Sequence, residues 1–96
     1  MQQQFNVYLQ VNIIQESKYF VIYSPALELS SHGKTLEKAK DAFAEAVEMF
    51  FEDIAERKIL KEVLEPLGWK FDNHKMISPT PKTAEMNINV PLKIYV

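Results

Sequence analysis

The chain has 96 residues, a formal net charge of −2, 47% apolar residues and 25% charged residues. This length allows one domain, 1–96, and the balance is that of a folded globular chain, not a disordered one. The absence of cysteine excludes disulfides and thiolate metal sites, and the slightly acidic balance argues against binding of bare nucleic acid. The first residues show no cationic start and no continuous apolar run, so we expect no signal peptide, no membrane span and a cytoplasmic location.

Three strands are predicted at the start of the chain. Apolar and polar residues alternate over 5–14, which predicts a half-buried strand. The segment 19–24 is aromatic and β-branched, so it predicts a second strand and a hairpin across the polar break 15–18. Pro25 interrupts this strand, and the short run 26–30 then fits a third. We therefore expect a three-stranded antiparallel sheet.

A long amphipathic helix is predicted next, from Leu36 to about Arg57. Its apolar residues recur every three or four positions and form one stripe; they are Leu36, Ala39, Phe43, Val47, Phe50 and Ile54. Thr35 can cap the helix through its hydroxyl, and Gly33 is expected to ease the turn that precedes it. Carboxylates occupy an arc of about 100° opposite the apolar stripe. We call five of them the acidic face: Glu37, Asp41, Glu45, Glu48 and Glu52.

The remaining part of the chain, after about Arg57, predicts a short helix, a linker and a last strand. The apolar pattern that begins at Ile59 predicts a short helix over about 58–66, and Gly68 fits the position just past the end of this helix. Two prolines keep 78–82 extended, and 85–96 alternates again as a strand does. We expect this strand to join the sheet or to cross to a second subunit, with Pro91 at an edge or bulge. The whole is an α+β domain with core 5–70 and a C-terminal linker and strand, 71–96.

No catalytic or metal-binding pattern emerges from the remaining polar residues. His32 and His74 lie far apart in predicted turns without a fixed carboxylate spacing, so we interpret both as surface residues. The first strand contains no acidic residue, and the acids of the long helix diverge, whereas two-metal nuclease chemistry needs converging carboxylates. Trp69 and Phe71 could stack on single-stranded nucleic acid, although core packing of Trp69 is the preferred interpretation. We expect no enzyme and no cofactor.

The strand–turn–helix region resembles the HicB-like antitoxin family of bacterial and archaeal toxin–antitoxin pairs. The matching residues are Pro25, Leu27, Gly33, Thr35, Leu36, Ala39, Glu45 and Ala46, followed by Leu-Gly-Trp at 67–69. The resemblance covers about residues 5–70 and implies a partial RNase H-like fold. It departs from the family where Lys38 stands in place of an acidic residue three positions after the Thr. No helix is predicted after residue 68, so the resemblance does not extend to the DNA-binding segment that many relatives carry.

The resemblance implies a protein that inactivates a partner by binding it. In this family the partner is a small basic RNase toxin of double-stranded-RNA-binding fold, whose active or RNA-binding surface the antitoxin masks. We expect the acidic face, together with the exposed side of the strands, to contact such a partner. The alternative is a structural or regulatory homo-oligomer that assembles through the C-terminal strand and has no toxin. A homodimer or a higher homo-oligomer is expected in either case.

Overall fold

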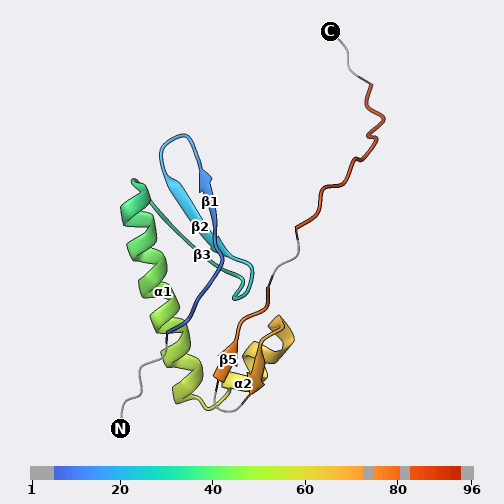
Figure 1. Cartoon of the computed structure of the whole chain (residues 1–96). Coiled ribbons are helices and arrows are strands. Elements are labelled where there is room, and N and C mark those ends of the chain that lie inside the picture. The colour runs from blue at the N-terminus through green and yellow to red at the C-terminus, as the bar shows by residue number, and fades with distance from the viewer. Residues whose placement is uncertain (1–5, 73–74, 81–82, 94–96) are drawn as a thin grey trace.

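A computed structural model of the chain describes residues 6–72, 75–80 and 83–93. Its main body is a three-stranded antiparallel sheet in the order β1-β2-β3, with the long helix α1 packed on one face (Figure 1). A short helix and a separate two-stranded sheet, β4-β5, follow α1. The predicted α+β class is therefore confirmed, with one long helix and one short helix beside an antiparallel sheet.

The sheet is built from β1 (Asn12–Gln15), β2 (Phe20–Ser24) and β3 (Leu29–Gly33). Ile13 faces Ile22 across the first pair, and Ile22 faces Ser31 across the second. The hairpin between β1 and β2 closes without glycine, because the Glu16 amide donates to the Tyr19 carbonyl at 2.8 Å.

Two predicted strand boundaries are wrong. The first strand was expected over 5–14, but strand pairing begins only at Asn12, because residues 6–11 run beside the core without a hydrogen-bonded neighbour in the sheet. Phe5 lies outside the described residues. The third strand was expected over 26–30, but residues 25–28 form a turn and pairing starts at Leu29. The turn contains Glu28 at a φ of 52°, which reverses the chain and shifts the strand toward Gly33.

Helix α1 spans Leu36–Glu56, as the apolar periodicity predicts. Ala39, Phe43 and Ile54 are buried on its inner side, while Val47 and Phe50 are half-buried there. α1 packs against β3 and, to a smaller extent, against β2. The helix therefore covers only part of the inner face of the sheet.

The chain then forms α2 (Leu60–Leu64) and the 3₁₀ turn η1 (Glu65–Leu67). Gly68 follows η1 with a φ of 97°, the left-handed conformation that ends helices. The hairpin of β4 (Lys70–Asp72) and β5 (Lys75–Ile77) was not predicted, because each strand has only three residues. Such short runs give too little alternation to be recognised.

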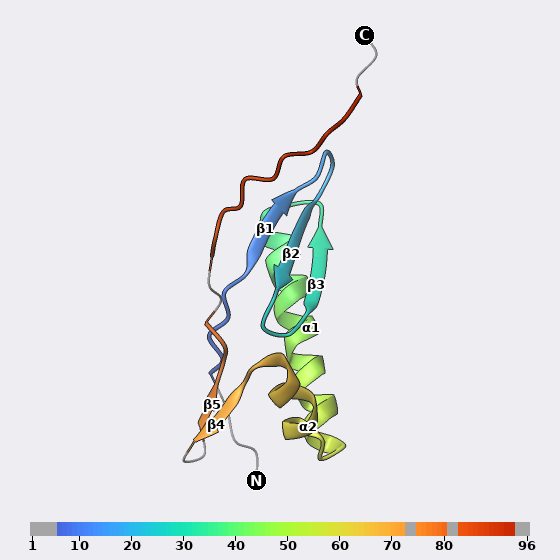
Figure 2. The same cartoon turned by 90° about the vertical axis from the view of Figure 1, so that its right-hand side faces the viewer.

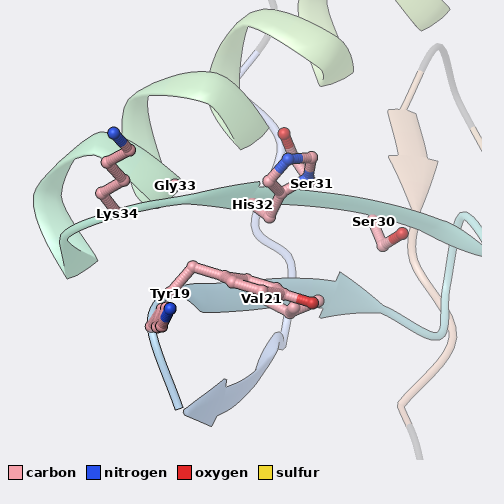
Figure 3. A pocket seen from close by; sticks show the side chains of 8 residues that line it. Tyr19, Val21, Ser30, Ser31, His32, Gly33 and Lys34 are labelled. Carbon is pink, nitrogen blue, oxygen red and sulfur yellow. The ribbon is translucent and has the colours of Figure 1, made fainter. Parts of the chain in front are cut away.

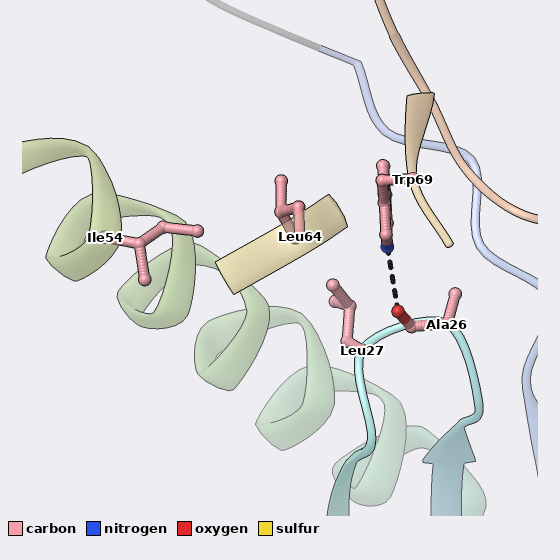
Figure 4. Packing of buried hydrophobic residues seen from close by; sticks show 5 residues of the cluster. All are labelled: Ala26, Leu27, Ile54, Leu64 and Trp69. Carbon is pink, nitrogen blue, oxygen red and sulfur yellow. Dashed lines mark hydrogen bonds between the residues drawn. The ribbon is translucent and has the colours of Figure 1, made fainter. Parts of the chain in front are cut away.

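The core consists of two adjoining clusters. One contains Ala26, Leu27, Ile54, Leu64 and Trp69, and the other contains Ile22, Ala39 and Phe43. The indole Nε1 of Trp69 donates a buried hydrogen bond of 2.8 Å to the Ala26 carbonyl, as Figure 4 shows. This bond joins the segment after α2 to the turn between β2 and β3. The interpretation of Trp69 as a core residue is therefore confirmed, since only 3% of its surface is exposed.

The predicted C-terminal strand, 85–96, does not form over its described residues 85–93. Residues 83–93 have no regular secondary structure and are exposed throughout, and Figure 1 shows them leading away from the sheet. Residues 94–96 lie outside the described part. The prediction that the strand joins the chain's own sheet is thus wrong for 85–93, because no described strand lies beside it as a hydrogen-bonding neighbour. The radius of gyration of the Cα atoms is 17.5 Å, whereas a compact domain of this length would have a radius of gyration of about 12 Å.

Candidate functional site

The junction of β3 and α1 is shaped by Gly33 and Thr35. The Thr35 hydroxyl accepts a hydrogen bond of 3.1 Å from the Lys38 amide and so caps α1. Gly33 does not adopt a positive φ, so glycine is not needed at this turn for a left-handed conformation. A Cβ at Gly33 would lie 2.5 Å from the backbone nitrogen of Ala39. Gly33 is required because the first turn of α1 lies directly against β3.

The acidic face is exposed along α1. All five of its side chains, Glu37, Asp41, Glu45, Glu48 and Glu52, are exposed to solvent. Among the described residues, the one ion pair joins Arg57 to Asp53 at 3.4 Å, and Asp53 is not part of the acidic face. No described cation therefore neutralises these five carboxylates through a direct ion pair. Their negative charge is available to a partner.

The acidic face and the open side of the sheet form two separate surfaces. α1 packs on the face of the sheet that carries Ile22, and the acidic face lies on the far side of the helix from its buried stripe. Figure 2 shows the strands in front of α1, so the helix separates the acidic face from the open sheet. The expected contact surface, which combined the acidic face with the exposed side of the strands, cannot be one continuous patch.

The open side of the sheet carries a shallow depression of about 740 Å³ beside the β1–β2 hairpin. Its lining residues are Lys18, Tyr19, Val21, Ser30, Ser31, His32, Gly33 and Lys34, most of which Figure 3 labels. The rings of Tyr19 and His32 meet edge to face, with centroids 5.7 Å apart. This surface is aromatic and basic, the opposite of the acidic face in charge.

The lining of this depression does not form a catalytic set. It contains no carboxylate that could orient His32. Ser31 is opposite Ile22 in the sheet and so projects toward α1, while its neighbour His32 projects to the open side. Ser30 does lie on the same open side as His32, but without a carboxylate to orient the imidazole these two residues do not make a catalytic set. His74 lies outside the described residues.

The second aromatic feature of the sequence does not form a stacking platform. Trp69 is buried, and the ring of Phe71 is half-buried with the Lys61 ammonium 5.6 Å from its centroid. The hypothesis that this pair stacks on single-stranded nucleic acid is therefore wrong for Trp69.

Within the described part of the chain, no group of three or more His, Asp or Glu side chains is placed to hold a metal ion.

Comparisons with protein-family models, with curated proteins and with solved structures gave no match. The function therefore has to be argued from the surfaces of the molecule. Across residues 6–72, 75–80 and 83–93, no helix is both long enough and apolar enough to cross a membrane.

Proposed function

We propose that this chain acts by binding, without catalysis of its own, and that its partner is a small basic protein held on the acidic face. The family resemblance would make it a HicB-like antitoxin and its partner an RNase toxin of double-stranded-RNA-binding fold. A cytoplasmic location is part of the same proposal. The observation that carries it is the row of five exposed carboxylates that no described cation pairs with.

The spacing of these carboxylates adds a small argument for a partner, because Lys38 and Lys40 only partly offset their mutual repulsion. Glu37, Asp41 and Glu45 are four residues apart, so each like-charged pair destabilises the helix by a few tenths of a kcal/mol. Glu48 and Glu52 repeat the pattern. From Glu37 to Glu52 the helix advances about 22 Å, which is comparable to the width of a small domain. Cations of a partner along this row would relieve the repulsion.

An RNA-binding surface is a suitable partner because it must carry cations for phosphates. A row of carboxylates on a rigid helix can occupy the same cations and exclude RNA. Such a contact is steered by charge, so its association rate should fall as the salt concentration rises. This is the electrostatic basis of the antitoxin proposal.

The test is a charge reversal with a matched control. The chain is tagged and recovered from its native cytoplasm, and co-eluting proteins are identified by mass spectrometry. We expect a stoichiometric small basic protein that salt releases. The double variant Glu45→Lys/Glu48→Lys should weaken its binding roughly tenfold or more. The control Glu62→Lys/Glu65→Lys makes the same change in charge on exposed positions of α2 and η1 and should bind normally. If both double variants lost partner binding equally, the proposal that the acidic face holds the partner would be contradicted.

A second candidate function is self-assembly through the C-terminal segment, residues 83–93. The observation that favours it is the exposure of every apolar side chain in its alternating row: Met86 81%, Ile88 66%, Val90 59% and Leu92 71%. If the recovery experiment yields the chain alone, with no basic partner and no nucleic acid, this second candidate replaces the first.

A further inference from the structure

The sheet has two outer strands, and they differ in composition. Figure 2 shows β1 and β3 at the two edges of the sheet. β3 presents Ser30, Ser31 and His32, which do not match an apolar strand. β1 presents Ile13 at 49% exposure and Ile14 at 47%, with Val11 just before it at 37%. Apolar cross-strand pairs stabilise a sheet, so β1 is the edge that suits the C-terminal segment.

The backbone of β1 has free hydrogen-bonding groups on this edge. The bond from the Glu16 amide to the Tyr19 carbonyl marks a hydrogen-bonded pair with the β2 side. Hydrogen-bonded pairs alternate with non-bonded pairs in an antiparallel ladder, so Ile14 and Asn12 also point their backbone groups toward β2. The amides and carbonyls of Ile13 and Gln15 therefore point to the free edge. Ile13 is opposite the buried Ile22, so its side chain lies on the same side of the sheet as α1.

Pro91 determines which residues of the C-terminal segment can bond to β1. Residues 87, 89, 91 and 93 direct their backbone groups to one side of an extended strand, and 86, 88, 90 and 92 direct theirs to the other. Pro91 has no amide hydrogen, so its side should face away from β1. The donors toward β1 are then Met86, Ile88, Val90 and Leu92, which are also the apolar residues.

These constraints agree only for an antiparallel pair. In an antiparallel pair, opposite residues with side chains on the same face point their backbone groups toward one another. Ile13 and an apolar residue such as Ile88 can then bond and both place their side chains on the α1 side. In a parallel pair, residues opposite one another do not share bonds in this way. If the apolar row lay on the α1 side in a parallel pair, the backbone of Pro91 would face β1, and Pro91 has no amide hydrogen to donate.

The route of the chain argues against pairing within one copy. The Ser78 hydroxyl donates to the Tyr8 carbonyl at 3.2 Å, so the C-terminal segment starts near the beginning of β1. From there it would run parallel to β1. An antiparallel approach would have to start at Gln15, about 23 Å farther along. Residues 79–85 span about 23 Å when fully extended, which leaves no residues to reverse direction. A second copy has no such restriction.

We propose that residues 86–92 of one copy add antiparallel to β1 of a second copy, in a reciprocal exchange that places the apolar row beside Ile13. The proposal specifies the second candidate function above and is independent of the acidic face. Each copy contributes six exposed apolar side chains: Val11, Ile13, Met86, Ile88, Val90 and Leu92. At roughly 60–120 Å² for each fully buried side chain, twelve of them with the paired backbone come to about 1,000 Å², enough for a specific interface.

The first test is the mass of the full chain in solution across a range of concentrations, by light scattering and sedimentation. We expect a dimer of the 11.2 kDa chain. Ile88→Asp and Ile13→Asp should each raise the dimer dissociation constant roughly tenfold to a hundredfold, because each buries an unpaired charge. The matched control Asn89→Asp adds the same charge on the outward side and should change it by less than about threefold. Far-UV circular dichroism checks that Ile13→Asp is still folded, and Ile88→Asp changes a side chain that is 66% exposed in one copy.

The second test is amide hydrogen exchange of the dimer, resolved by residue. The amides of Ile88, Val90 and Leu92 should be protected, while those of Asn87, Asn89 and Lys93 should exchange quickly. A chain that stays monomeric at all concentrations would overturn the proposal. So would a dimer that Ile88→Asp dissociates and Ile13→Asp leaves intact, because the C-terminal segments would then pair with each other. The dimer mass and the exchange pattern do not depend on whether a basic partner binds the acidic face. Either proposal can therefore be refuted without affecting the other.

Discussion

Substitution of Gly33 by alanine tests the fit between β3 and α1, because the sign of its effect depends on that fit. Gly33 has an ordinary φ, so alanine introduces no backbone strain. Without a clash, Gly33→Ala would stabilise the fold by about 0.4–1 kcal/mol, because alanine reduces the freedom of the unfolded chain. The added Cβ would instead lie 2.5 Å from the Ala39 nitrogen and 2.8 Å from the Lys38 carbonyl carbon. Both are backbone atoms, so α1 itself must move.

We therefore expect Gly33→Ala to lower the free energy of unfolding by about 1–3 kcal/mol, as overpacking of a close contact does. The assay is urea denaturation, monitored by circular dichroism at the helix band. The dependence of the unfolding free energy on urea concentration is compared between the variant and the parent chain, because an equal slope supports two-state unfolding in both. Gly68→Ala is a useful comparison, because its cost arises from its φ of 97° and its Cβ would meet only the Pro79 side chain at 3.3 Å. An unchanged or raised midpoint for Gly33→Ala would refute the argument that α1 lies directly against β3.

Three further substitutions test local interactions by the same denaturation assay. Thr35→Ala should cost about 1 kcal/mol because the Lys38 amide loses its cap; an unchanged midpoint would show that the cap is energetically irrelevant. Trp69→Phe should cost about 2–4 kcal/mol, since it leaves the buried Ala26 carbonyl unpaired and opens a small cavity; a loss below about 0.5 kcal/mol would contradict this. Glu28→Gly should stabilise the fold by up to about 1 kcal/mol, because it relieves a positive φ of 52°; a destabilised variant would count against strain at this turn.

The sequence determined the elements that depend on local pattern. The apolar stripe and Thr35 were sufficient to predict α1, because helical periodicity and capping involve residues within a few positions of one another. Gly68 was recognised as the residue that ends the short helical region for the same reason. The exposure of the acidic face also followed from the helical pattern, since one side of the helix had to face the sheet.

Tertiary structure decided how these elements meet. Residues 5–14 alternate as a strand does, yet among the described residues 6–15 only Asn12–Gln15 finds a pairing partner, because a strand exists only where a neighbour supplies hydrogen bonds. The polar run Ser30–His32 lies in β3 for the converse reason, since β2 provides that neighbour. The alternating residues 86–92 have no neighbouring strand within the described part of the chain. Sequence pattern therefore determined which residues are able to form a strand, and only the arrangement in space decided which of them are paired.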